Sequence, residues 1–254
     1  LDKLSPCDIA ARGEETCARS FIGDFGLRAY RRPLTPAEQE SLLATYQKGR
    51  MGTDHRTGIR LVLTRMLASP LFLYRPEFGD GTRGSGMMAL SPWETATRLS
   101  YLLWGTMPDQ ALFDAAAAGK LSTDAEIAST VARMIADPRA KEVGRRFASG
   151  WLLLDVLERA TKDPTLAPGF DKLAPAMAEE LHRVVGEVLW GGALGDLFST
   201  KDTYVNRELA SFMGLPPPAG TGFERVTLTP DGPKGPAWRA GILTMPAILA
   251  AQGK

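Results

Sequence analysis

The sequence is poor in the residues that favour β-strands. Its 254 residues include only 9 Val and 7 Ile, against 33 Ala and 32 Leu. Because β-branched residues favour strands while Ala and Leu favour helices, this ratio argues against an all-β sandwich and against a parallel α/β sheet. We therefore predict an all-α protein of about nine helices in one or two packed bundles, with at most a minor short strand near residues 223–228.

Neither sign of charge dominates, and no long apolar run is present. Lys and Arg number 30 and Asp and Glu 29, so the formal net charge is +1. This balance excludes a broad basic surface for nucleic acid. The most apolar runs are short and contain Arg65 and Asp155, whereas a bilayer span needs roughly 18–20 apolar residues. We expect neither a nucleic-acid partner nor a transmembrane segment, and 44% apolar residues indicate a folded chain.

Cysteine is almost absent as well, with only Cys7 and Cys17. Two interpretations compete: a local disulfide in an exported protein, or two buried thiols in a cytosolic protein. The polar stretch between them favours the disulfide. A structural zinc site needs four nitrogen or sulfur ligands, and the neighbouring residues do not supply the others. We predict no metal site and no cofactor in this chain.

The ends of the sequence suggest a piece of a longer protein. The chain begins at Leu1 with no initiator Met and no export signal. It stops soon after an apolar helix predicted within residues 239–254.

Capping boxes mark the beginnings of three helices, at residues 35–38, 91–94 and 123–126. In each, Ser or Thr is followed three residues later by Glu, and apolar residues then recur every three or four positions. Similar apolar spacing or helix-starting signals predict further helices over residues 14–31, 54–67, 108–118, 137–154, 171–189 and 205–213.

Glycine and proline divide the chain. The glycine-rich stretch at 76–90 predicts a linker, and a second break with many Pro and Gly residues follows residue 213. The predicted organisation is an N-terminal helical domain, a linker, a second helical domain, and a Pro/Gly-rich loop that leads into the start of a third domain: 1–80, 81–90, 91–215 and 216–254.

The candidate catalytic residues are Glu179, Glu180, His182 and Glu187, all on the helix predicted at 171–189. The first and third form a Glu-x-x-His pair, which is half of a di-iron carboxylate site. Such a site needs a second Glu-x-x-His pair, which the sequence lacks. We therefore favour a solvated, salt-bridged face on which Arg183 aligns with Glu180 and Glu187.

The remaining polar motifs favour structural interpretations. His55 stands in the first turn of its predicted helix, where polar side chains usually face solvent, and Gly52 occupies the position where a Glu-x-x-His pair would require Glu. The basic run at 28–33 suits a helix C-terminus, which favours cations. Motifs for a serine nucleophile, a P-loop, dinucleotide binding and covalent haem attachment are missing, and Ser149 has no evident partner.

Long stretches of the chain resemble known domains of unknown function. CARSFIGDFGLRAYRRPLTPAEQESLLATYQKG and residues 58–77 resemble the domain numbered fifteen-ninety-five. Residues 90–121, 177–189 and 203–215 resemble domain fifteen-ninety-two, and residues 239–252 resemble the opening of domain fifteen-eighty-eight. The three domains would together span nearly the whole chain, in the order that is usual for them.

The resemblance implies a large exported protein of planctomycetes, myxobacteria and similar bacteria, often with a c-type haem-binding segment near its N-terminus. It assigns no catalytic residues, because none are established for these domains. Cys7 and Cys17 match the cysteines that usually precede the arginine-rich stretch, which strengthens the disulfide interpretation.

Three functions remain open. We prefer a structural or interaction module of a larger periplasmic or extracellular protein, whose partners are the other domains of its parent chain, including a c-type cytochrome domain that would carry the haem. The second is part of an extracytoplasmic redox enzyme whose active centre is completed by other domains. The third is a surface polysaccharide-binding module that uses exposed aromatic residues such as Tyr204 or Trp238.

Overall fold

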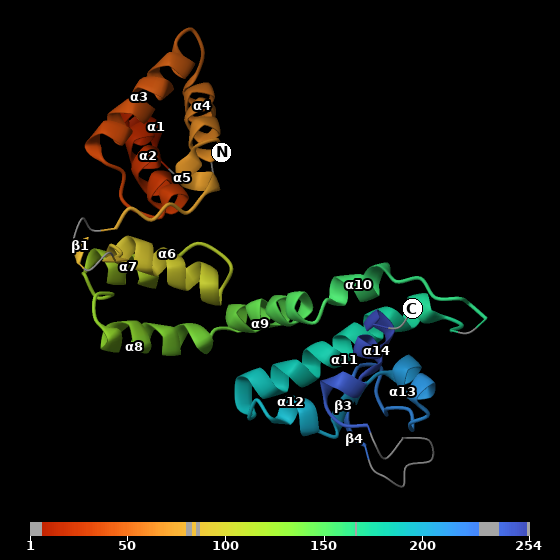
Figure 1. Ribbon diagram of the computed structural model, residues 1–254. Helices are drawn as coiled ribbons and strands as arrows, with labels where there is room; N and C mark the ends of the chain where they lie inside the picture. The colour runs from red at the N-terminus through yellow and green to blue at the C-terminus, as the bar shows by residue number, and fades with distance from the viewer. Residues whose placement is uncertain (1–6, 80–82, 85–86, 166, 229–238, 253–254) are drawn as a thin grey trace. The chain divides into compact units, whose positions relative to one another are not determined.

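A computed structural model describes residues 7–79, 83–84, 87–165, 167–228 and 239–252. The chain divides into two compact units, Leu1–Asp137 (unit 1) and Pro138–Lys254 (unit 2). Helices make up most of both units (Figure 1), which confirms the predicted fold class. The described residues contain fourteen α-helices and not about nine, since several have only four residues and are too short to show an apolar period.

Unit 1 begins with a small helical bundle. Its elements are α1 (Ile9–Arg12), α2 (Glu14–Tyr30), α3 (Pro36–Arg50), α4 (His55–Leu67) and α5 (Pro70–Leu73). The second, third and fourth helices pack on one another around a core that includes Phe21, Leu42, Tyr46 and Met66. Gly58 lets α3 and α4 approach closely, because a Cβ atom there would lie 2.6 Å from the Tyr46 ring.

The disulfide predicted for the first segment is present. Cys7 and Cys17 are bonded, with Cα atoms 5.6 Å apart, and the second of them is buried in α2. The bond ties Cys7, which lies just before α1, to the bundle.

The rest of unit 1 is a short hairpin followed by three helices: β1 (Arg83–Gly84), β2 (Met87–Met88), α6 (Pro92–Leu103), α7 (Gln110–Ala117) and α8 (Asp124–Ile135). The hairpin lies inside the predicted linker. Helix α6 packs on α7 and α8, and the indole Nε1 of Trp104 donates to the Met134 carbonyl at 2.9 Å. All three predicted capping boxes, at the starts of α3, α6 and α8, are confirmed.

Unit 2 is built around one long helix, α11. Its helices are α9 (Pro138–Trp151), α10 (Leu154–Arg159), α11 (Phe170–Gly191), α12 (Asp196–Ser199), α13 (Arg207–Met213), the 3₁₀ helix η1 (Ile242–Thr244) and α14 (Pro246–Gln252). The apolar stripe of α11 supplies much of the core, and α9, α10, α13 and α14 all pack against this helix.

Two strands complete unit 2. The predicted short strand is present as β4 (Glu224–Thr227), and it pairs antiparallel with β3 (Asp202–Val205), which was not predicted. Thr203 lies opposite Val226, and the Thr203 side chain is buried against α11. Among the described residues, no helix has the length and apolar character required to cross a membrane.

Candidate functional site

The predicted Glu-x-x-His pair on α11 faces α9. The Glu179 carboxylate lies 2.9 Å from Arg145 Nη1 and 2.7 Å from Arg183 Nε, one oxygen to each. Burial opposes ionisation of Glu179, but these two guanidinium groups outweigh it and lower its pKa. His182 Nε2 lies 2.7 Å from Ser149 Oγ. Both carboxylate oxygens of Glu179 are thus already engaged in ion pairs, one with Arg145 and one with Arg183.

The contact between Ser149 and His182 shows that the serine does have a partner, contrary to the prediction. A serine and a histidine at this distance resemble two members of a hydrolase triad. However, the Ser149 hydroxyl also lies 3.1 Å from the Arg145 carbonyl one turn earlier, a common bond for a helical serine. The backbone N–H groups around Ser149 belong to α9, where helical hydrogen bonds use them, so they are not positioned to stabilise an oxyanion. We interpret the contact as a link between α9 and α11.

Glu180 is buried, which contradicts its predicted place on a solvated face. Its side chain is 1% exposed, and Thr203 Oγ1 donates to Oε1. Oε2 has no hydrogen-bond partner among the described residues. Glu180 and Arg239 both line a small cavity of about 10 Å³. Burial raises the pKa of Glu180 to about 7, although Thr203 and Arg239 act in the opposite direction. The cavity has room for about one water molecule and none for a substrate.

The last candidate on α11 contacts a third element. Glu187 Oε1 lies 3.6 Å from Arg225 Nε on β4, so the four candidates face α9, β3 and β4 and do not converge on one point. His55 Nδ1 lies 2.8 Å from the hydroxyl of Tyr46, which is a core residue of unit 1. Within the described residues, no three His, Cys, Asp or Glu side chains gather as a metal site would require.

A cleft in unit 1 brings together cationic and aromatic side chains that are distant in the sequence. Its volume is about 520 Å³, within the usual range for ligand pockets. The residues that line it come from the end of α2, from α5 and the segment after it, and from α6. They include four arginines and four aromatic residues: Arg31, Arg32, Arg75, Arg98, Tyr30, Phe78, Trp93 and Tyr101.

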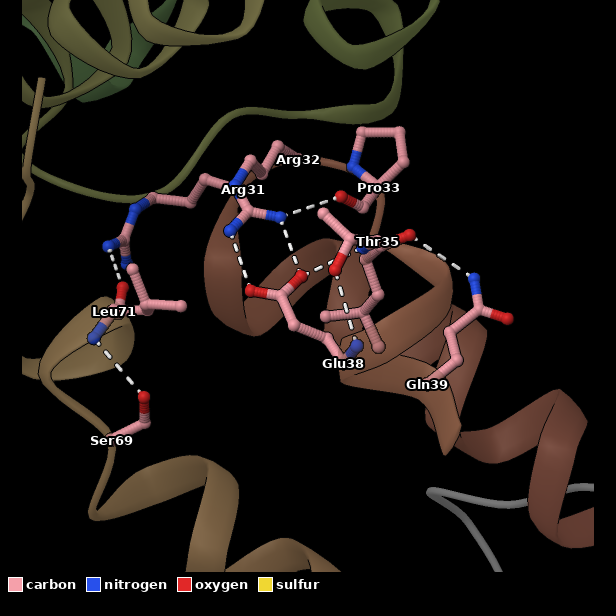
Figure 2. Close-up of polar contacts among 9 residues, drawn as sticks. Arg31, Arg32, Pro33, Thr35, Glu38, Gln39, Ser69 and Leu71 are labelled. Atoms are coloured by element: carbon pink, nitrogen blue, oxygen red, sulfur yellow. Dashed lines mark hydrogen bonds and ion pairs between the residues drawn. The ribbon is translucent and has the colours of Figure 1, made fainter. Parts of the chain in front are cut away.

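Arg31 is the buried arginine of this cleft, with 5% of its surface exposed. Its backbone is left-handed, with φ at 59°, where α2 ends, a conformation that costs a residue other than Gly roughly 1 kcal/mol or more. Its Nη2 donates to the carbonyls of Leu71 at 2.5 Å (Figure 2) and Tyr74 at 2.6 Å, where the short helix α5 leaves carbonyls without helical partners. Carbonyl oxygens hold this guanidinium, and no carboxylate of the described residues forms an ion pair with it.

The neighbouring arginine is neutralised. Arg32 makes a two-pronged ion pair with Glu38, at 2.9 and 2.8 Å, as Figure 2 shows. Glu38 also accepts from the backbone N–H of Thr35 in the capping box of α3. The bonds from Arg32, aided by Thr35, lower the pKa of Glu38 to about 2. This pair fixes the turn from α2 into α3 and so holds Arg31 in place.

Arg75 supplies the accessible positive charge of the cleft. The guanidinium carbon of Arg75 lies 4.3 Å from the centroid of the Tyr101 ring, and that of Arg31 lies 5.8 Å from the same centroid. Arg98 is paired with Glu77 at 3.0 Å. Arg75 is exposed and has no carboxylate partner among the described residues.

None of the acidic groups at the cleft forms an ion pair with Arg75 among the described residues. Glu94 accepts from the backbone N–H groups of Ser91, Phe78 and Gly79. These bonds lower its pKa even though burial, the largest single effect, acts to raise it. With Glu94 counted as ionised, the four arginines exceed Glu38, Glu77 and Glu94 by one positive charge, so the cleft keeps a small local excess of positive charge.

Sequence reasoning missed most of this cleft. The basic run at 28–33 does lie at the end of α2, with Arg28 in the last turn and Arg31 at the C-cap, but Arg31 and Arg32 also line the cleft. Nothing in the sequence indicates the convergence of this run with Arg75 and Tyr101, because these residues lie more than forty positions away and meet it only through tertiary packing.

Tyr204, an alternative binding residue, is partly buried against the core and lies under Arg183, with the guanidinium carbon 5.7 Å from its ring centroid. Trp238 lies outside the described residues.

Two matches with known families agree with the resemblance found in the sequence. Residues 17–77 match a family described as a protein of unknown function (DUF1595), and residues 90–215 match a family described as a protein of unknown function (DUF1592). The likeness of residues 239–252 to domain fifteen-eighty-eight stays a prediction. No curated protein and no solved structure matches the chain significantly. The cleft takes Arg75 from the first region and Tyr101 from the second, so its lining combines a part similar to DUF1595 with a part similar to DUF1592.

Proposed function

We propose that this chain is a ligand-binding module of a larger exported protein and that the cleft of unit 1 binds an acidic oligosaccharide. The observation that carries the proposal is the placement of Arg75 over Tyr101 in a cleft of about 520 Å³. Beside them lies the buried Arg31, which forms no ion pair with a carboxylate of the described residues. The proposal develops the predicted interaction module and the predicted polysaccharide-binding module into one function located at a defined place.

The chemistry of the lining fits such a ligand. A guanidinium group presents parallel N–H donors that match the two oxygens of a carboxylate. Aromatic rings such as Tyr101 and Trp93 offer flat apolar faces against which the C–H side of a sugar ring can pack. A uronic acid presents both features on one ring, and an oligomer repeats them at a spacing that a cleft with several arginines can use.

The disulfide supports the cellular part of the proposal. Disulfides persist in oxidising compartments, so the bond between Cys7 and Cys17 is the expected finding for a periplasmic or extracellular protein. An acidic polysaccharide of the cell envelope would be accessible there. Association with a c-type cytochrome domain of the parent chain stays a prediction.

Calorimetric titration with trigalacturonate tests the proposal, and its methyl ester serves as the uncharged counterpart. We expect the acid to bind and the ester to bind at least about tenfold more weakly, because a charge-assisted hydrogen bond contributes about 1.5–3 kcal/mol. Arg75→Gln should weaken binding of the acid by about ten- to a hundredfold for the same reason.

Arg28→Gln is the matched control. Arg28 is also exposed and also lies over an aromatic ring of unit 1, with its guanidinium carbon 5.8 Å from the centroid of Phe25, but it does not line the cleft. The Arg28→Gln substitution should leave the binding of trigalacturonate unchanged. Equal binding of acid and ester, wild-type binding by Arg75→Gln, or binding of pyrophosphate but not of the uronate would each overturn the assignment.

A further inference from the structure

Unit 2 contains a second cleft, and its lining is mostly apolar. Its volume is about 610 Å³, and it lies where α13 and α14 pack on the first half of α11. Phe170, Leu173 and Met177 form one wall, at helical spacings of three and four that place them on the same face of α11. A cavity of this size with an apolar wall is typical of sites for small molecules.

The rim of this cleft exposes large apolar side chains. Phe212 of α13 is 56% exposed and Leu249 of α14 is 50% exposed, and both line the cleft. Apolar residues grouped around a concavity commonly mark a binding site, whereas single exposed apolar residues need no explanation.

Charge distinguishes this cleft from an ordinary packing gap. Among the residues that the structure describes, its lining includes two cations, Lys162 and Arg239, and no acidic residue. Arg239 is partly buried, and its Nε and Nη2 both reach a single acceptor, the Thr244 carbonyl, at 3.3 Å. No carboxylate of the described residues forms an ion pair with it. Burial lowers its pKa, opposed by the charge of Glu180.

We infer that this cleft binds a small amphiphile, with its apolar chain along the α11 wall and its single acid group on Arg239. A guanidinium that is partly removed from water gains most from a partner that is both anionic and able to accept two hydrogen bonds. A long-chain carboxylic acid supplies that group together with an apolar body for the cleft. The inference concerns unit 2 alone and does not depend on the saccharide site of unit 1.

Calorimetric titration of the full chain with three ligands of equal chain length tests the inference. Decanoate, decanol and decyltrimethylammonium share a ten-carbon chain and have an anionic, a neutral and a cationic head group, respectively. We expect decanoate to bind at least about tenfold more tightly than the other two, which corresponds to a single charge-assisted contact. Arg239→Met should abolish this preference, and Arg239→Lys should restore part of it.

The apolar half of the site is tested at its rim, where substitution leaves the core intact. Phe212→Ser combined with Leu249→Ser should weaken the binding of all three ligands. Leu194→Ser is the control, because Leu194 is 69% exposed in the same unit and lies outside the cleft. Equal binding of the three ligands would overturn the inference. So would a concentration-dependent dimer that the rim substitutions dissociate, because a second copy would then be the occupant.

Discussion

Replacing Glu180 by Gln is expected to change how the stability of unit 2 depends on pH. The Glu180 carboxyl is held inside unit 2, with one oxygen bonded to Thr203 and the other without a hydrogen-bond partner in the part of the chain that the structure describes. Burial raises its pKa from 4.5 to about 7, with the attraction of Arg239 too weak to prevent this. The substitution keeps the shape of the side chain and an acceptor oxygen for Thr203, but it removes the ionisable group.

The direction of this pH dependence follows from whether Glu180 holds its proton in the folded and in the unfolded chain. Between pH 4.5 and about 7, the unfolded chain has released the Glu180 proton while the folded chain retains it. Stability therefore falls as pH rises through this interval, and the contribution is fully present only below the unfolded pKa. Because one pKa unit corresponds to about 1.4 kcal/mol, the loss from this group approaches about 3 kcal/mol. Glu180→Gln should thus be nearly neutral near about pH 4.5 and stabilising above about pH 7.

Hydrogen exchange of α11 peptides in increasing urea measures this effect for unit 2 alone. Wild type and variant are compared at the same pH, so that intrinsic exchange rates cancel. Glu179→Gln is the matched control on the adjacent residue. Its pKa is lowered in the folded state, so its contribution is present at neutral pH and is lost as pH falls. The two variants should therefore show opposite pH trends. A constant loss of stability for Glu180→Gln at every pH would refute the reasoning, since it would mean that Glu180 stays ionised beside Arg239.

Three further substitutions test the fold. Cys17→Ser should lower the stability of unit 1 by about 2–3 kcal/mol in urea unfolding, as should reduction of wild type, because the bond to Cys7 closes a loop with a sequence separation of 10. Gly241→Ala should lower the melting temperature, because φ is 64° there and a Cβ atom would lie 2.4 Å from the Phe198 backbone. Arg31→Met should cost about 2–3 kcal/mol and speed hydrogen exchange around α5, since it leaves the Leu71 and Tyr74 carbonyls without their charged donor.

Features encoded within a few residues could be predicted from the sequence. The capping boxes at 35–38, 91–94 and 123–126 all formed, because each needs only a hydroxyl and a carboxylate three positions apart. The strand at 224–227 was recognisable by its alternation. Its partner, β3, could not be recognised, because polar Thr203 is buried while the aromatic Tyr204 is only partly buried, which obscures the alternation.

The sequence does contain an indication that Glu180 is buried, but the same spacing also fits an exposed position. It lies three positions after Met177 and four before Val184, so it falls on the apolar stripe of α11. Its spacing from Arg183 and Glu187 also fits a charged face, which is the basis of the predicted solvated, salt-bridged surface. The structure places Arg183 and Glu187 at the surface and Glu180 in the core. Periodicity alone could not decide, since a residue at the border of two faces fits both.

The two clefts could not have been predicted, because each depends on contacts between distant parts of the chain. Arg31 reaches the carbonyl of Leu71, and Arg239 lies beside the α11 wall that contains Met177. In both places an arginine forms no ion pair with a carboxylate of the described residues, a property that composition and motifs do not report. A net charge of +1 gave no indication of it, because it is a sum over the whole chain and hides local excess.

The two proposed sites should differ in their response to salt, and this difference separates them experimentally. Arg75 is exposed, so counterions screen its attraction for a carboxylate, and trigalacturonate should bind markedly more weakly at about 500 mM than at about 50 mM sodium chloride. Arg239 is partly buried and its ligand would be held mainly by apolar contacts, which added salt does not weaken. Decanoate binding should therefore change little over the same range. A loss of decanoate binding as steep as that of trigalacturonate would place its acid group at the surface and contradict the assignment of Arg239.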